Sequence, residues 1–193
     1  KDDENIGKTA EKGKSNFVGP EIEGKKLGVI GLGAIGVLVA NAANKLGMEV
    51  YGYDPFMSVN SAWALSKHVR KAKDMDEIFK TCDYITVHVP STKDTKGMLN
   101  KEKFALMKDG ARLLNFARGD LVVNENLLEA VETGKLSKYI TDFAAQEFIG
   151  KDNIIVLPHL GASTPESEDN CARMAVQELK DFLENGNIKN SVN

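Results

Sequence analysis

The stretch KLGVIGLGAIG, residues 26–36, decides the fold. It begins as a short apolar run and continues into a GxGxxG pattern made by Gly31, Gly33 and Gly36. Between a strand and a helix, these glycines allow a tight turn, let a pyrophosphate approach the backbone, and pack the helix closely. The first N–H groups of the helix then point at the phosphates. We therefore predict a dinucleotide site here, against the plainer alternative of a packing turn.

An acidic residue stands where the next predicted strand ends. Asp54 closes the run EVYGYD and follows Gly36 by 18 residues. A carboxylate at this place accepts hydrogen bonds from the ribose hydroxyls of NAD, and its charge opposes the 2′-phosphate of NADP. The basic run KHVRKAK, residues 67–73, offers that phosphate a counter-charge in principle, although a solvated surface is its simpler explanation. NAD is therefore the predicted cofactor.

The rest of the chain alternates between apolar runs and amphipathic segments. Strands separated by helices are typical of a parallel sheet, and continuous apolar runs fit strands that are covered on both faces. The expected fold is α/β, with a doubly wound, mostly parallel sheet of the Rossmann type. The predicted strands span 26–31, 49–54, 68–72, 84–90, 112–117, 138–143 and 153–158, and the predicted helices span 34–47, 74–82, 100–107, 124–134 and 164–186.

Composition narrows the class of protein. The 193 residues are 42% hydrophobic and 27% charged, with a formal net charge of −3, which gives no sign of a nucleic-acid or membrane partner. The isolated cysteines Cys82 and Cys171 favour a reducing, cytoplasmic setting, and no metal site is predicted. Residues 1–16 are polar without a period, so we expect a flexible arm, or a helix without its partner, before a domain over 17–193.

Ligands of doubly wound sheets bind beyond the carboxyl ends of the strands, and charged residues follow several of these ends. Arg118 comes after a buried run, and it is either paired with Asp120 in a surface turn or free to bind an anion through two parallel N–H bonds. A histidine can exchange a proton with a hydroxyl group, which makes His159 a candidate acid–base, although a lone histidine is more often structural. Glu147 can hold such a ring and favour its protonated form. Together, the three residues suit the oxidation of an alcohol beside a carboxylate.

Five segments resemble the D-2-hydroxyacid dehydrogenase family, and the match covers residues 17–193. They are VGPEIEGKKLGVIGLGAIG (18–36), YGYDP (51–55), CDYITVHVPSTKDTKGMLN (82–100), LLNFARGDLVVNENLLEAV (113–131) and VLPHLGASTPESEDN (156–170). The resemblance implies NAD-dependent oxidation of a small D-2-hydroxy acid to a 2-oxo acid.

The resemblance also implies the site. The family's catalytic arginine, glutamate and histidine fall on Arg118, Glu147 and His159. With the glycine motif and the strand ends included, the predicted cofactor-binding residues are Gly31, Gly33, Ala34, Ile35, Gly36, Asp54, Pro90, Phe116, Ala117, Arg118, Asp142, His159, Leu160, Gly161 and Ala162.

The chain departs from the family pattern before His159. Glu147 lies 29 residues after Arg118, which suits the family, but only 12 residues before His159, and Gln146 and Phe148 flank it in place of the common Glu-Pro. The resemblance implies a homodimer through this domain and a second lobe built from both chain ends. We therefore expect this chain to bind NAD without turning over substrate. The alternative function is a non-catalytic, corepressor-like NAD-binding module of the same family.

Overall fold

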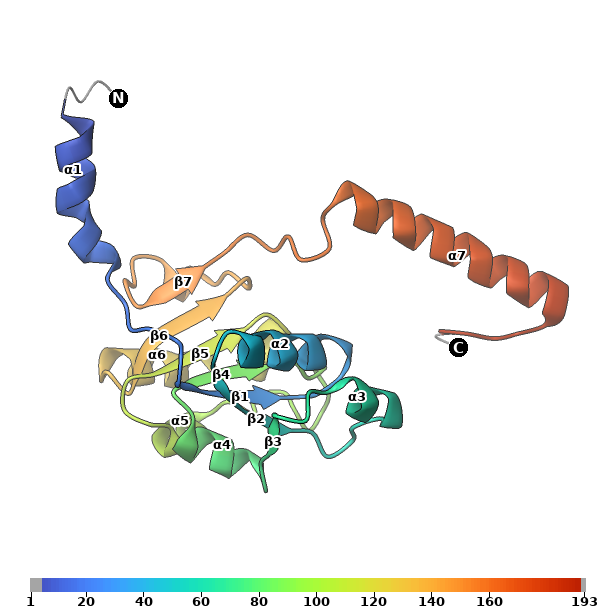
Figure 1. Ribbon diagram of the computed structural model, residues 1–193, viewed down its shortest axis with the longest axis horizontal. Coiled ribbons are helices and arrows are strands. Elements are labelled where there is room, and N and C mark those ends of the chain that lie inside the picture. The colour runs from blue at the N-terminus through green and yellow to red at the C-terminus, as the bar shows by residue number, and fades with distance from the viewer. Residues whose placement is uncertain (1–4, 192–193) are drawn as a thin grey trace. The chain divides into compact units, whose positions relative to one another are not determined.

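The computed structural model of the chain describes residues 5–191, in two compact units divided between Leu157 and Pro158. The first unit holds the sheet and the second holds one long helix (Figure 1). The first four residues of the predicted arm lie outside the described residues. The arm continues as α1 (Ile6–Gly13) and the 3₁₀ turn η1 (Lys14–Phe17), and α1 has no buried residue.

Seven parallel strands form one sheet in the order β3-β2-β1-β4-β5-β6-β7. The order reverses beside β1, where Ile30 stands opposite Tyr53 on one side and Val87 on the other. This reversal is the switch point at which doubly wound folds bind their ligands. The predicted doubly wound parallel fold is therefore confirmed, with every strand pair parallel. The strands are β1 (Lys26–Ile30), β2 (Glu49–Tyr53), β3 (Arg70–Lys71), β4 (Tyr84–Val87), β5 (Ala111–Asn115), β6 (Leu136–Thr141) and β7 (Ile154–Val156).

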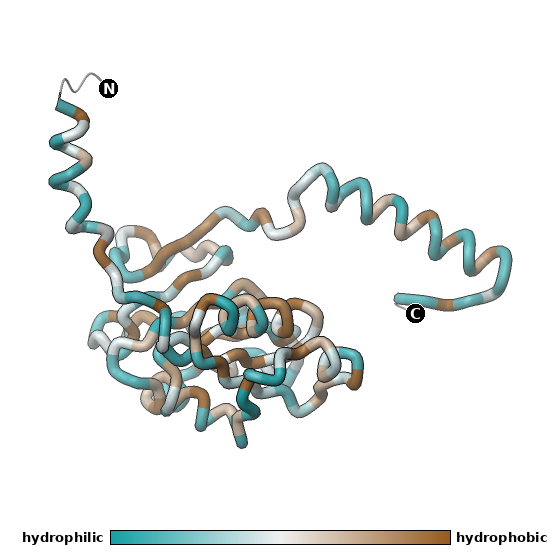
Figure 2. Tube along the Cα trace, in the orientation of Figure 1, coloured by the Kyte–Doolittle hydropathy of each residue, from teal (hydrophilic) through white to brown (hydrophobic). Residues whose placement is uncertain are grey.

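Helices pack against both faces of the sheet and bury two apolar clusters. One cluster joins α2 to β1 and β2, and the other joins α4, α5 and α6 to β4, β5 and β6. Hydrophobic residues accordingly follow the strands of the first unit (Figure 2). The helices of this unit that follow β1 are α2 (Ala34–Lys45), α3 (Val59–Ala64), α4 (Met75–Thr81), α5 (Lys101–Leu106) and α6 (Asn124–Glu132).

Side-chain caps explain where several helices begin. The Asp74 carboxylate accepts a hydrogen bond from the Glu77 N–H at 2.8 Å, which starts α4. The hydroxyl of Ser58 accepts a bond from the Ser61 N–H at 3.0 Å and starts α3. The sequence pattern does not predict α3, because its six residues are too few to show a helical period.

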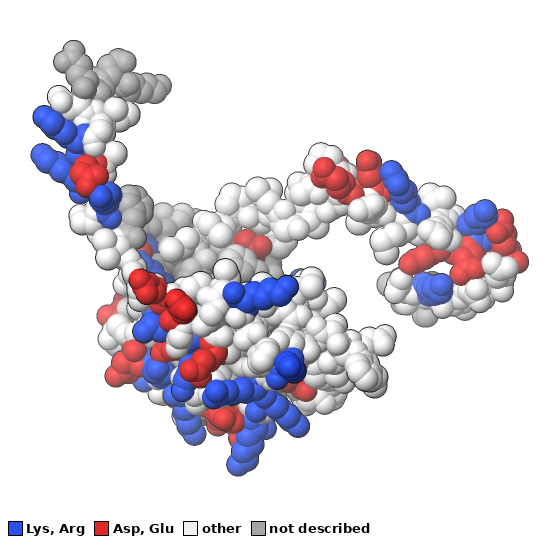
Figure 3. Space-filling model, in the orientation of Figure 1, with Lys and Arg blue, Asp and Glu red and all other residues white. Residues whose placement is uncertain are grey.

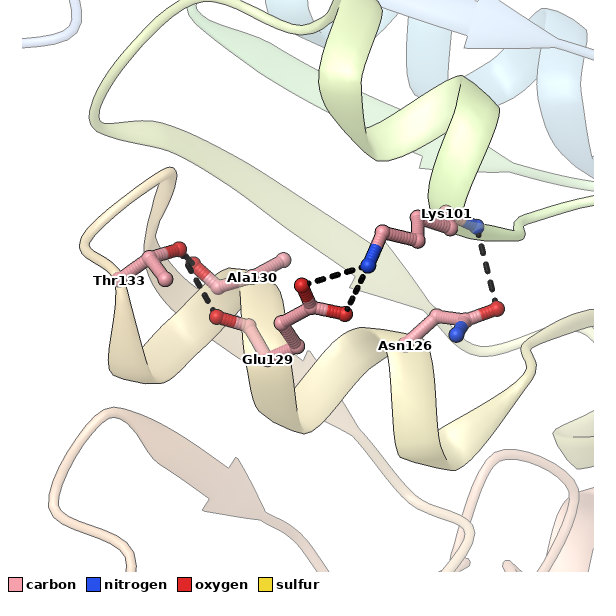
Figure 4. Close-up of polar contacts among 5 residues, drawn as sticks. All are labelled: Lys101, Asn126, Glu129, Ala130 and Thr133. Carbon is pink, nitrogen blue, oxygen red and sulfur yellow. Dashed lines mark hydrogen bonds and ion pairs between the residues drawn. The ribbon is translucent and has the colours of Figure 1, made fainter.

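The helices α5 and α6 are fastened to each other over their face of the sheet (Figure 4). The Lys101 ammonium lies 2.7 and 2.9 Å from the two Glu129 carboxylate oxygens, and the Lys101 N–H donates to the Asn126 side chain at 3.1 Å. The ion pair is largely exposed, so it contributes at most about 1 kcal/mol to stability. The contact instead helps to set the position of α6. This helix begins at Asn124, which donates a hydrogen bond to the predicted site residue Glu147.

The second unit consists mainly of α7 (Pro165–Asn185). The Thr164 hydroxyl accepts a bond from the Ser167 N–H at 3.1 Å, and Gly186 ends the helix with a φ of 70°, as its sequence pattern predicts. No residue of α7 is buried. Hydrophobic and hydrophilic residues alternate along this helix (Figure 2). The expectation of one domain over 17–193 stays a prediction.

Candidate functional site

The predicted site residues of the first unit gather in the loops that follow parallel strands. Several strands end earlier than the sequence predicted: β4 ends at Val87, β5 at Asn115 and β6 at Thr141. Residues that the sequence analysis placed inside strands therefore lie in loops, at the same edge of the sheet as the glycine loop. They are Pro90 after β4, Phe116 and Ala117 after β5, and Asp142 after β6.

The three glycines of the loop after β1 differ in what surrounds them. Gly31 has a φ of 92°, and a Cβ there would lie 2.5 Å from the His88 carbonyl oxygen. A Cβ at Gly36 would lie 1.9 Å from the Gly31 carbonyl oxygen. At Gly33 a Cβ would meet nothing within 4 Å. Two glycines thus close the turn, while Gly33 leaves open space beside the backbone.

The beginning of α2 offers hydrogen-bond donors beside that open space. Gly33 is the N-cap of α2 and supplies no side-chain cap. The first turn of a helix has N–H groups without intrahelical acceptors, and its dipole is positive there. Ala34 and Ile35 are the first residues of this turn. The arrangement therefore fits a phosphate group at Gly33.

Asp54 connects the glycine loop to the segment that follows β2. One carboxylate oxygen accepts the Leu32 N–H at 2.8 Å, and the other accepts the Phe56 N–H at 2.8 Å. A carboxylate oxygen has a second lone pair, so both can still accept ribose hydroxyls. The sequence predicted the ribose role but not the bond that also lets Asp54 hold the loop.

A cavity of about 580 Å³ lies between the glycine loop and α3. Gly33 and Asp54 line it, together with residues that the sequence analysis did not single out, including Phe56, Ser58 and Asn60. Apolar walls with a few polar groups are what a nucleoside needs. The residues present therefore fit the ribose and base of a dinucleotide whose phosphates lie at Gly33. In the sequence, the aromatic residue Phe56 directly after Asp54-Pro55 was the signal that could have indicated this side of the cavity.

Arg118 leaves its guanidinium on the surface. The side chain is exposed, and its Nη1 donates to the Ala117 carbonyl at 2.6 Å. Within residues 5–191 it forms no ion pair, and the Asp120 carboxylate instead accepts a bond from the Ser91 hydroxyl at 2.6 Å. The surface-turn explanation, which paired Arg118 with Asp120, therefore fails. Anion binding by Arg118 stays a prediction.

Glu147 lies in the 3₁₀ turn η3 (Gln146–Phe148) and is exposed. Its Oε1 accepts a hydrogen bond from the Asn124 side-chain amide at 2.8 Å. Its own backbone N–H, and then Asn124, lower the pKa of the carboxyl group. Glu147 is therefore held ionised, which suits a partner for a cation better than a proton donor.

The third predicted catalytic residue lies in the other unit. The second unit begins at Pro158 and contains His159, Leu160, Gly161 and Ala162. The structure thus brings the residues after β1, β2, β4, β5 and β6 to one edge of the sheet. The predicted roles of the four residues after Pro158, in catalysis and cofactor binding, stay predictions.

The backbone of His88 packs against Gly31 of the glycine loop. Its Nε2 lies 3.0 Å from the Thr86 hydroxyl, and its carbonyl oxygen is the atom that a Cβ at Gly31 would strike. Burial lowers the pKa of the His88 ring, so the neutral form is favoured. The residue is a packing element of the site.

The basic run after α3 forms a solvated edge of the sheet. Basic side chains gather over β3 and α4 (Figure 3). Within the run, the Arg70 guanidinium donates to the Tyr51 hydroxyl at 3.1 Å and lies 3.6 Å from a Glu49 carboxylate oxygen. These contacts agree with a surface role. No helix within residues 5–191 is long and apolar enough to cross a membrane.

Replacing Asp54 by alanine is expected to narrow the preference for NAD over NADP. The change removes the charge that opposes a 2′-phosphate and the acceptor for the ribose hydroxyls. Calorimetric titration with both cofactors measures the preference. Glu49→Ala, at the opposite end of β2, removes the same charge away from the site and is expected to keep it. Equal affinity of the unaltered chain for NAD and NADP would contradict the assignment.

Comparison with known proteins agrees with this geometry. Residues 3–161 match the family model described as D-isomer specific 2-hydroxyacid dehydrogenase, NAD binding domain. D-3-phosphoglycerate dehydrogenase of Synechocystis sp. is 38% identical over 176 residues, which cover 88% of this chain and 31% of that protein. The Bacillus subtilis enzyme of the same name is 37% identical over 96% of this chain and 36% of its own. The chain thus spans about a third of the length of these relatives.

Solved structures show the same likeness. The NAD⁺-bound 3-phosphoglycerate dehydrogenase of Entamoeba histolytica has a TM-score of 0.79 and 30% identity, over 97% of this chain and 62% of that chain. The D-lactate dehydrogenase of Aquifex aeolicus, complexed with NAD and lactic acid, has a TM-score of 0.76 and 30% identity, over 92% and 61% of the two chains. The chain therefore belongs to the family of D-isomer-specific 2-hydroxyacid dehydrogenases, of which it carries the NAD-binding domain, and its cofactor is NAD.

Proposed function

We propose that the full-length protein oxidises a D-2-hydroxy acid to a 2-oxo acid with NAD as oxidant. The specific reaction we propose is that of D-3-phosphoglycerate to 3-phosphohydroxypyruvate, which begins serine biosynthesis. The glycine loop supports the first statement most, because Gly33 is open to a phosphate while the same loop is bonded to Asp54. The relatives named D-3-phosphoglycerate dehydrogenase support the second.

The proposed roles follow from the chemistry of each side chain. NAD, when bound, accepts a hydride from the substrate carbon that carries the hydroxyl group. Arg118 holds the substrate carboxylate through two parallel N–H bonds. His159 takes the hydroxyl proton on a ring nitrogen as the C–H bond breaks, and returns it in the reverse reaction. Glu147, held ionised by its own backbone N–H and then by Asn124, favours the protonated ring.

The partners are part of the same proposal. We propose a cytoplasmic homodimer formed through this domain, with a small 2-hydroxy acid as substrate and no nucleic-acid or membrane partner. The family resemblance supports the dimer, and the formal net charge of −3 supports the absence of a polyanionic partner. The same resemblance supports a second lobe, without which this chain binds NAD but does not turn over substrate.

Replacing Arg118 by lysine in the full-length protein is expected to lower kcat/KM for the hydroxy acid by about a hundredfold or more, although the charge is retained, because lysine cannot reproduce the planar two-bond contact. Affinity for NAD is expected to change much less. Steady-state kinetics with D-3-phosphoglycerate and calorimetry with NAD measure the two effects.

Arg112→Lys is the matched control. Arg112 lies near the amino end of β5, whereas Arg118 lies in the loop after the carboxyl end of this strand, and the Arg112 guanidinium carbon lies 5.1 Å from the centre of the Tyr84 ring. The control is expected to leave turnover unchanged. Near-normal kcat/KM in Arg118→Lys would show that Arg118 is structural. Tight NAD binding by a full-length protein that oxidises no hydroxy acid would favour the corepressor-like module instead.

A further inference from the structure

The loop that carries Arg118 is held by a buried side-chain amide. Asn115, the last residue of β5, is fully buried. Its Oδ1 accepts the N–H groups of Ala117 and Arg118 at 3.2 and 3.4 Å. Its Nδ2 donates to the Arg118 carbonyl at 2.8 Å and to the Tyr139 hydroxyl at 3.3 Å. The amide thus uses both of its donors and both acceptor positions, and three of its four bonds end on the backbone that carries Arg118.

Tyr139 extends this arrangement to the neighbouring strand. It lies in β6, is 1% exposed, and turns its hydroxyl toward Asn115. Burial raises the pKa of this hydroxyl, so it stays neutral, while hydrogen bonds from Thr141 and Asn115 act in the opposite direction. A neutral buried hydroxyl can fix the Asn115 amide without introducing a charge.

The ring of Tyr139 reaches the turn that carries Glu147. The Tyr139 and Phe148 rings make an edge-to-face contact, with ring centres 5.8 Å apart and planes at 74°. Phe148 is 6% exposed and anchors η3, in which Glu147 is the preceding residue. Aromatic edge contacts of this kind add to the stabilisation that burial alone provides. The buried residues Asn115, Tyr139 and Phe148 therefore form a continuous chain of contacts. They hold the backbone of Arg118 at one end and the turn that contains Glu147 at the other.

We infer that Asn115 and Tyr139 are positioning residues that set the Arg118 loop and the Glu147 turn in one fixed arrangement. The inference rests on the proposed function, in which Arg118 holds the substrate carboxylate. Neither residue reaches the surface, so neither contacts substrate. Their effect on turnover acts through the backbone of Arg118 and through Phe148. A misplacement of about 1 Å at a binding group can lower the rate about a hundredfold, so this support decides whether the site works.

Two substitutions in the full-length protein test the inference. Tyr139→Phe removes only the hydroxyl and keeps the ring against Phe148, and we expect a loss of about five- to tenfold in kcat/KM for the hydroxy acid. Asn115→Ala frees the loop, and we expect a loss on the order of a hundredfold, with KM raised as well as kcat lowered. Hydrogen exchange at the Ala117 and Arg118 amides is expected to accelerate in Asn115→Ala.

Tyr51→Phe is the matched control, because it removes a tyrosine hydroxyl that accepts one hydrogen bond, from Arg70, on β2. A purely structural role would lower the melting temperature of the site variants without changing kcat/KM below the melting range. Turnover in both site variants equal to that of the control would overturn the inference. If Asn115→Ala does not fold, Tyr139→Phe decides alone. If Arg118→Lys itself keeps normal turnover, the proposed role of Arg118 fails. That failure is distinguishable from failure of the inference, in which Arg118→Lys loses turnover while Asn115→Ala and Tyr139→Phe keep it.

Discussion

Replacing Gly33 by alanine is expected to weaken NAD binding by about a hundredfold, or ~2.8 kcal/mol, while the fold is unaffected. Gly33 has φ −75° and ψ −161°, an extended backbone that alanine adopts freely, and its new methyl group would meet no protein atom within 4 Å. The methyl group would occupy the space in which the pyrophosphate approaches the backbone. Calorimetric titration with NAD and a thermal melt of the same sample separate the two effects.

Gly19→Ala is the control for this prediction. Gly19 also has no neighbour within 4 Å of its added Cβ, and it precedes β1, whereas the glycine loop follows β1. The control is expected to bind NAD normally. If Gly33→Ala bound NAD as tightly as the control, the phosphates would not lie at this loop.

Replacing Gly36 by alanine is expected to damage both stability and NAD binding. The added Cβ would lie 1.9 Å from the Gly31 carbonyl oxygen, a backbone atom that cannot rotate away. The loop and the first turn of α2 must shift apart, which is expected to cost about 1–3 kcal/mol of unfolding free energy. The shift also moves the N–H groups that meet the phosphates, so NAD affinity is expected to fall with it.

Urea denaturation and NAD titration of Gly36→Ala check both parts. The pair of glycine variants is informative because they differ in kind: Gly33→Ala loses binding alone, and Gly36→Ala loses binding together with stability. An unchanged denaturation midpoint in Gly36→Ala would mean that the close packing of α2 on the loop is not present in solution.

The sequence carried enough information to predict the sheet and the cofactor. Three features can be recognised from short stretches of sequence without knowledge of the fold. They are the apolar run before Gly31, the spacing of the glycines and the acidic residue Asp54. The second role of Asp54, as acceptor for the Leu32 N–H, depends on the close approach of two loops. The side of the cavity formed by α3 depends on six residues without a helical period. Neither feature has a local signature.

The same distinction separates Arg118 from the residues that hold it. An arginine after an apolar run attracts attention because it breaks the pattern. Asn115 sits inside that run, and its importance becomes visible only when its four hydrogen bonds are seen. A buried amide in an apolar strand was nevertheless a usable signal, since polar groups in such positions need partners. The strand ends were predicted too late because apolar composition continues beyond the last paired residue, as in Phe116 and Ala117.

We propose that NAD binds at the carboxyl ends of the strands, on the glycine loop and Asp54. Titration of the isotope-labelled chain with NAD, followed by NMR, tests it most directly. We predict saturable shifts of the backbone amides of Leu32, Gly33, Ala34 and Phe56, with the amides of Lys26 and Glu49 at the opposite ends of β1 and β2 unchanged. Shifts confined to the opposite ends of the strands, or no saturable shift at all, would show that NAD does not bind at the glycine loop.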